Sequence, residues 1–67
     1  MSDLMKKFRS LTPDEFNKTI AGLSGLALMV APIILKQGGT TDQAAEATLD
    51  LMIAVDAITE IKKQIYG

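Results

Sequence analysis

The 67-residue chain contains no cysteine and no histidine, and these two absences remove much of the usual chemistry of protein sites. Without cysteine, neither a disulfide framework nor thiolate ligation can replace a small hydrophobic core. Without histidine, the commonest metal ligand and the commonest general base are both missing. We therefore expect no catalytic residue, no metal site and no cofactor, and we do not expect the protein to be an enzyme.

Charge of either sign is also limited, and it falls unevenly along the chain. The formal net charge is -1, with a balance of +1 over residues 1–18 and of -3 over residues 40–67. So mild a dipole is able to orient antiparallel neighbours, but it provides no phosphate-binding surface. We therefore do not expect the protein to bind nucleic acid.

Aromatic residues are few, yet 48% of the chain is hydrophobic. This length allows one domain at most, residues 1–67, and a domain so small buries only about 60% of its unfolded surface. Aliphatic and alanine side chains suit the packing of helix on helix. The excess of apolar surface predicts a partner, either a second copy of the chain or another protein.

The longest apolar stretch, residues 20–35, contains no charged residue and lies between Lys18 and Lys36. A helix that is apolar all round must be covered on every side. The rest of so short a chain can cover only part of it, so this stretch gives the strongest reason to expect association.

Local signals predict a helix over residues 13–37. Thr12 suits the N-cap, Pro13 suits the first helical position, and Glu15 completes a capping box with Thr12. Pro32 has no N–H to donate and crowds the preceding turn, so we expect a kink or a local break close to it.

A second set of signals predicts a tight turn and another helix. Gly38 and Gly39 end the first helix, and Gly38 suits the left-handed position that follows a helix end. Thr40 and Gln43 form a second capping box, after which no glycine or proline interrupts a helix over residues 41–66. So short a connection forces the two helices into an antiparallel hairpin.

Residues 3–9 form a short amphipathic segment, with Leu4, Met5 and Phe8 on one face and basic side chains outside it. Two interpretations are open: an anchor on a membrane surface, or a short helix that docks on the end of the hairpin. Two turns are too few for strong membrane binding, which favours docking.

Helical spacing divides the apolar residues into two sets. We predict that the intra-hairpin core consists of Phe16, Ile20, Leu23, Ala27, Val30, Ile34, Leu51, Val55, Ile58 and Ile61. We predict that the oligomer or partner interface consists of Gly22, Gly25, Leu26, Met29, Ile33, Leu49, Met52 and Ile53.

Asp50 and Asp56 interrupt the apolar middle of the second helix. Carboxylates inside an oligomer or a membrane would be costly and would indicate proton handling. Six residues apart, they lie on different faces of a helix, which argues against a single two-carboxylate site. We favour solvated carboxylates, or carboxylates paired with lysines of a neighbouring helix.

The predicted fold is all-α: an antiparallel two-helix hairpin with a short N-terminal helix, assembling into a homo-oligomeric helical bundle. The predicted function is non-enzymatic self-association or assembly through protein–protein contacts in the cytoplasm. A third hypothesis is a small inhibitor or adaptor that folds on a target protein.

The alternative is a small membrane-inserted hairpin, either pore-forming or a membrane scaffold. Residues 20–35 would span about 24 Å as a helix, short of the about 30 Å of a hydrocarbon core. A second crossing would carry Asp50 and Asp56 close to its middle. These mismatches favour the soluble oligomer, although membrane contact and a membrane location stay open.

Overall fold

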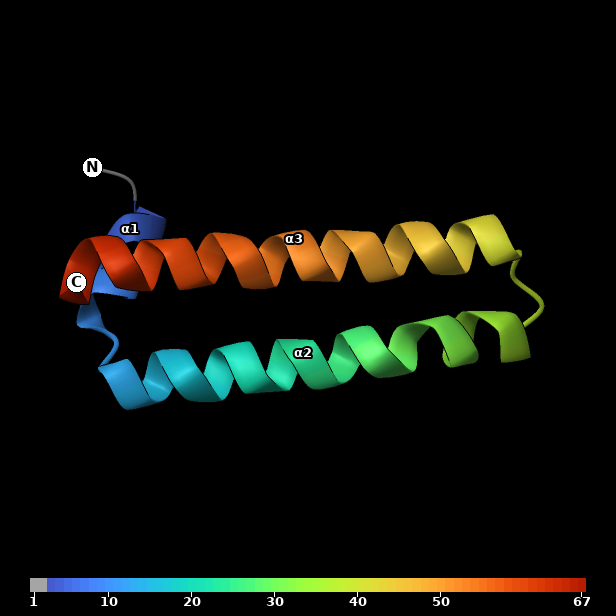
Figure 1. The fold of residues 1–67 in the computed structure, drawn as a ribbon, viewed down its shortest axis with the longest axis horizontal. Coiled ribbons are helices and arrows are strands. Elements are labelled where there is room, and N and C mark those ends of the chain that lie inside the picture. The colour runs from blue at the N-terminus through green and yellow to red at the C-terminus, as the bar shows by residue number, and fades with distance from the viewer. Residues whose placement is uncertain (1–2) are drawn as a thin grey trace.

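The computed structural model describes residues 3–67, and this part of the chain is helical apart from short connections. It contains α1 (Asp3–Ser10), α2 (Pro13–Lys36) and α3 (Thr41–Tyr66). α2 and α3 pack against each other in opposite directions, so the turn lies at one end, and α1 and the end of α3 lie at the other, which we call the terminal end (Figure 1). The molecule is a rod with extents of 40 × 23 × 17 Å.

α2 begins at the capping box expected from the sequence. The Thr12 backbone N–H donates to Glu15 Oε1 at 2.9 Å, and the Glu15 N–H donates to Thr12 Oγ1 at 3.2 Å. Pro13 follows in the first turn, where its missing N–H leaves no helical bond unmade. The start of α2 is therefore fixed by hydrogen bonds between residues that are close in the sequence.

The turn between α2 and α3 is closed by two backbone hydrogen bonds. The Gly38 N–H donates to the Leu35 carbonyl at 3.2 Å, and the Gly39 N–H donates to the Ile34 carbonyl at 2.8 Å. This pair of bonds, with Gly38 at a φ of 88°, is a Schellman motif. The turn thus satisfies carbonyls that the end of α2 would otherwise leave unpaired.

The second capping box starts α3 directly after this turn. The Thr40 N–H donates to Gln43 Oε1 at 2.9 Å, and the Gln43 N–H donates to Thr40 Oγ1 at 3.1 Å. The helix then continues without interruption to Tyr66.

α2 continues through Pro32 as a single α-helix. The local break considered from the sequence is therefore absent. A kink without a break at this position stays a prediction.

An aromatic cluster joins all three helices at the terminal end of the rod. The ring of Phe16 stacks on Phe8 of α1 at 6.1 Å between centroids and meets the edge of Tyr66 of α3 at 6.0 Å. The Tyr66 hydroxyl donates to the Leu11 carbonyl. α1 is therefore docked on the hairpin through Phe8, while Leu4 at its start stays 61% exposed.

The interior of the rod is very thin. Within residues 3–67, Phe16 and Ala44 are the only buried side chains, with 0% and 3% of their surface exposed. Two helices in contact along one side of each leave the remaining sides in solvent, so the hairpin has a seam rather than a closed core.

We expect Gly39→Ala to destabilise the hairpin more than Gly38→Ala. A Cβ on Gly39 would meet the Ile34 side chain and would lie 2.9 Å from the Ile34 carbonyl oxygen. A Cβ on Gly38 meets no atom within 4 Å, but its left-handed backbone would cost roughly 1–2 kcal/mol. Thermal unfolding followed by circular dichroism measures both, and equal stabilities for Gly39→Ala and wild type would contradict the turn geometry.

We also expect part of the stability to be lost in acid through Glu15. The bond from the Thr12 backbone N–H, aided by the Thr12 hydroxyl and by Lys18, lowers the pKa of Glu15 from its ordinary value of 4.5. The contribution is present above that ordinary value and disappears as the pH falls through the lowered one. Glu15→Gln should therefore flatten the loss of melting temperature below about pH 4.5.

The second capping box provides the matched control, because Gln43 occupies the same position and does not titrate. Gln43→Glu should add acid sensitivity, because it places a titratable carboxyl in a capping box that has none in the wild type. An unchanged acid profile in both variants would show that neither box contributes in this pH range.

Candidate protein interaction surface

Every residue predicted for the intra-hairpin core is buried or half-buried, and all of them belong to α2 and α3, the two helices that pack against each other. Phe16 is buried and the others are half-buried. These half-buried residues are Ile20, Leu23, Ala27, Val30, Ile34, Leu51, Val55, Ile58 and Ile61. Each helix thus directs one apolar stripe at the other, and a second helix alone covers that stripe only in part.

The residues predicted for the partner interface are, with one exception, exposed on the hairpin. Gly25 is half-buried, and the other seven are exposed. The six large side chains have exposed fractions between 46% and 59%: Leu26, Met29, Ile33, Leu49, Met52 and Ile53. Exposed apolar residues on two adjacent helices form a surface of the kind that marks interaction sites.

Two further exposed leucines of α2 belong to this surface, although the predicted interface did not include them. Leu28 is 82% exposed and Leu35 is 49% exposed. The signal that could have found them is the charge-free run itself, because a helix without a polar face has apolar residues on every side. The middle of α2 is therefore apolar around its whole circumference.

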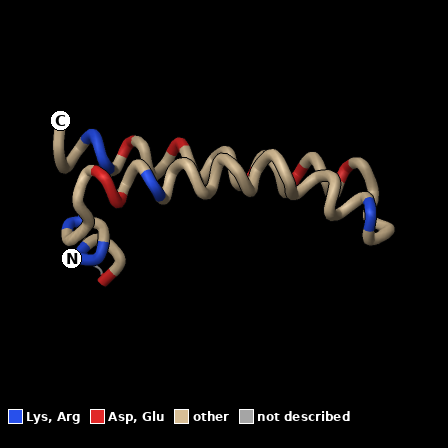
Figure 2. Tube along the Cα trace, turned by 90° about the horizontal axis from the view of Figure 1, so that it is seen from below, with Lys and Arg blue, Asp and Glu red and all other residues tan. Residues whose placement is uncertain are grey.

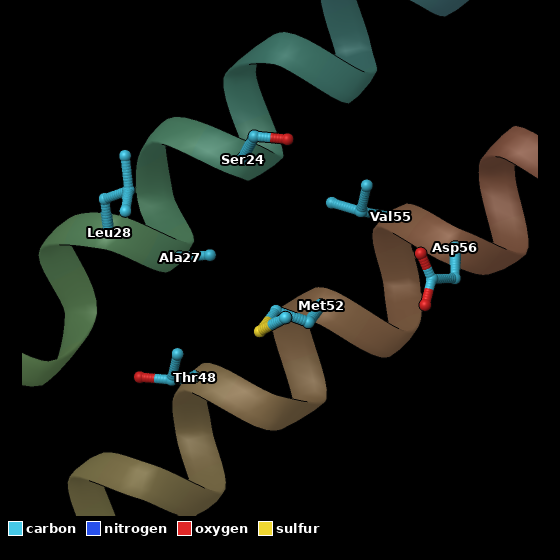
Figure 3. Close-up of a pocket in the computed structure, with 7 residues that line it drawn as sticks. All are labelled: Ser24, Ala27, Leu28, Thr48, Met52, Val55 and Asp56. Atoms are coloured by element: carbon cyan, nitrogen blue, oxygen red, sulfur yellow. The ribbon is translucent and has the colours of Figure 1, made fainter.

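A shallow apolar groove of about 330 Å³ lies between α2 and α3 within this surface (Figure 3). Its walls are Ser24, Ala27 and Leu28 from α2, and Thr48, Met52, Val55 and Asp56 from α3. The Thr48 hydroxyl already donates to the Ala44 carbonyl at 2.9 Å within α3. The groove therefore offers mainly apolar contact, with the Asp56 carboxylate as its one charged group.

The middle of α2 contains no charged side chain. No Lys, Arg, Asp or Glu occurs between Lys18 and Lys36, and Figure 2 shows the corresponding long uncharged stretch. On α3, Asp50 and Asp56 are both exposed. Within residues 3–67, no group of three or more acidic, histidine or cysteine side chains is placed to hold a metal ion.

Gly22 and Gly25 lie on α2 with open space around them. A Cβ added to either would meet no atom within 4 Å, apart from the backbone of its own helix turn. The hairpin therefore gives no packing reason for a glycine at either position, although each glycine costs a helix about 1 kcal/mol relative to alanine.

The helix Pro13–Lys36 is long and apolar enough to cross a membrane, and it is the one such helix within residues 3–67. Very little of its most apolar part is buried inside the hairpin. Length and composition alone give weak evidence for a membrane span, since exposed helices of assemblies have the same properties.

No protein-family model matches the chain, and no match is found among curated proteins or among solved structures.

In dilute solution, where the chain is a single hairpin, we expect Gly22→Ala and Gly25→Ala each to raise the free energy of unfolding by about 1 kcal/mol. The open space around both positions accepts a methyl group without strain. Circular dichroism across a thermal or urea transition measures the change. A loss of stability at a concentration where sedimentation shows only monomer would mean that these positions are covered within the hairpin itself.

Proposed function

We propose that the protein is a non-enzymatic self-association module whose copies pack through the exposed apolar surface into a helical bundle. One observation carries the proposal: two long helices are apolar on more than one side, yet only Phe16 and Ala44 are buried among residues 3–67. A second hairpin supplies helices of matching length and matching apolar faces.

The shape and chemistry of the surface support contact with helices in particular. Its side chains are mainly leucine, isoleucine and methionine on two neighbouring helices, and such side chains interdigitate when helices pack. The open positions at Gly22 and Gly25 would allow a neighbouring backbone to come close, which accounts for two glycines that the hairpin alone does not need. The assembly would serve a structural or regulatory task through protein contacts, in the cytoplasm.

A membrane-inserted form is the second candidate, and the length and apolarity of Pro13–Lys36 favour it. In that arrangement α2 would enter the bilayer. Asp50 and Asp56 on α3 would oppose entry of the second helix, because a carboxylate inside hydrocarbon is costly. Ultracentrifugation of protein expressed without detergent separates the two: protein in the supernatant supports the bundle, and protein that requires detergent supports the membrane form.

Leu49→Glu and Met52→Glu should each shift the protein toward monomer while leaving its helical content nearly unchanged. Both side chains are more than half exposed on the hairpin, so a carboxylate at either position stays solvated in one copy but would be buried between copies. Sedimentation velocity and circular dichroism at equal concentrations measure the two effects. Gln64→Glu, at an exposed position outside the apolar middle, is the control and should still associate.

Two results would overturn the proposal. A wild-type protein that stays monomeric at every accessible concentration has no self-association to explain. Complete unfolding by Leu49→Glu, with Gln64→Glu intact, would place Leu49 inside the hairpin instead of at an interface.

A further inference from the structure

The two ends of the hairpin carry opposite net charge. The terminal end, which we define as residues 3–18 and 58–67, contains six Lys or Arg and four Asp or Glu residues. The loop end, residues 34–50, contains one Lys and three Asp or Glu residues. The antiparallel fold creates this division, because it brings the basic residues of α1 to the same end of the rod as the lysines that end α3 (Figure 2).

The middle of the hairpin is almost free of charge. Residues 19–33 and 51–57 together contain one charged side chain, Asp56, and Asp50 directly borders the second segment on the side of the loop end. Most of the exposed apolar surface described above lies on these two segments, since Leu26, Met29 and Met52 all belong to them. A partner that covers the middle over its full length must therefore also meet the positive end and the negative end.

α1 adds a difference of shape to this difference of charge. It lies at the terminal end and to one side of the layer formed by α2 and α3 (Figures 1 and 2). It carries Lys6, Lys7 and Arg9, all exposed. Any partner lying along that side of the layer meets a basic projection at one end and none at the other.

We infer that the partner of the exposed apolar surface is a second copy of this chain lying antiparallel to the first, so that the terminal end of each copy faces the loop end of the other. The inference rests on the proposed self-association and specifies its direction. It describes an isologous pair, in which the same surface of both copies is used.

Charge and shape both favour this direction over the parallel one. Copies lying in the same direction would place the two positive ends side by side and the two negative ends side by side. Like charges closer together than about 8–10 Å still repel one another at physiological salt concentration. They would also bring two α1 helices to the same end. The antiparallel direction pairs opposite charges and separates the two α1 helices by the length of the rod.

Distances between spin labels test the direction directly, and the absence of native cysteine allows one label per chain. Gln37→Cys labels the loop end and Gln64→Cys labels the terminal end, both at exposed positions. Pulsed electron paramagnetic resonance on Gln37→Cys alone should give a distance between copies close to the 40 Å length of the hairpin. An equal mixture of the two labelled proteins should add a much shorter distance.

The possible outcomes separate this inference from the proposed function. A short distance in the Gln37→Cys sample alone means parallel pairing, which overturns the inference and leaves self-association standing. No coupling between copies in either sample overturns both. If the protein binds lipid vesicles but its copies do not associate in buffer, a membrane covers the apolar surface instead of a second copy. That result would also overturn both the inference and the proposed function.

Salt dependence provides a second and independent test. Antiparallel wild-type pairs should dissociate more readily at high salt, by about fivefold in the dimer dissociation constant, since exposed charge pairs contribute weakly and are screened. Lys7→Glu with Lys63→Glu makes the terminal end as negative as the loop end, so salt should strengthen association of this variant.

The neutral pair Lys7→Gln with Lys63→Gln is the matched control and should show little salt dependence. Lys62 is left unchanged because its Nζ donates to Asn17 Oδ1 at 2.8 Å and links α3 to α2. Wild-type association that grows stronger with salt, together with the reverse in the Glu variant, would contradict the antiparallel direction.

Discussion

In a hairpin of two helices, each helix can cover only one side of the other, and the rest of the structure depends on this geometric limit. α2 is apolar on every side between Lys18 and Lys36, and α3 presents only one face to it. The result is a rod in which Phe16 and Ala44 are buried while Leu28 is 82% exposed. Hydrophobic burial is the main favourable contribution to folding and association, so the uncovered surface is the dominant source of free energy still available to this chain.

The hairpin is held in shape by short-range contacts at its two ends. At the loop end, the Schellman bonds of Gly38 and Gly39 lead directly into the capping box of α3. At the terminal end, the Phe16 ring contacts both Phe8 and Tyr66, and these contacts join α1 and α3 to α2. Because both ends are fixed independently of the middle, the middle can remain exposed for a partner without the helices separating there first.

The charged residues give direction to a surface that would otherwise be nearly symmetric. Apolar contact has little orientational preference, whereas charge patterns suppress wrong arrangements and fix the register of a complex. The unequal ends of this hairpin arise from the fold, since Arg9 and Lys63 are far apart in sequence but share one end of the rod. In the proposed assembly, apolar contact along the middle would hold the copies together, and the charges at the ends would orient them.

The helix boundaries depend on neighbours in the sequence, and local signals located them well: the expected segments 13–37 and 41–66 differ by at most one residue from Pro13–Lys36 and Thr41–Tyr66. Helical spacing likewise agrees with the burial pattern, because a regular helix fixes the direction of each side chain: the predicted core residues are buried or half-buried, and the predicted interface residues other than Gly25 are exposed. Only the tertiary structure decided that the helix continues through Pro32, that Leu28 is the most exposed large apolar residue, and that Phe8, Phe16 and Tyr66 meet. These features depend on how the helices lie in space, and no local pattern encodes a contact across 50 residues of chain.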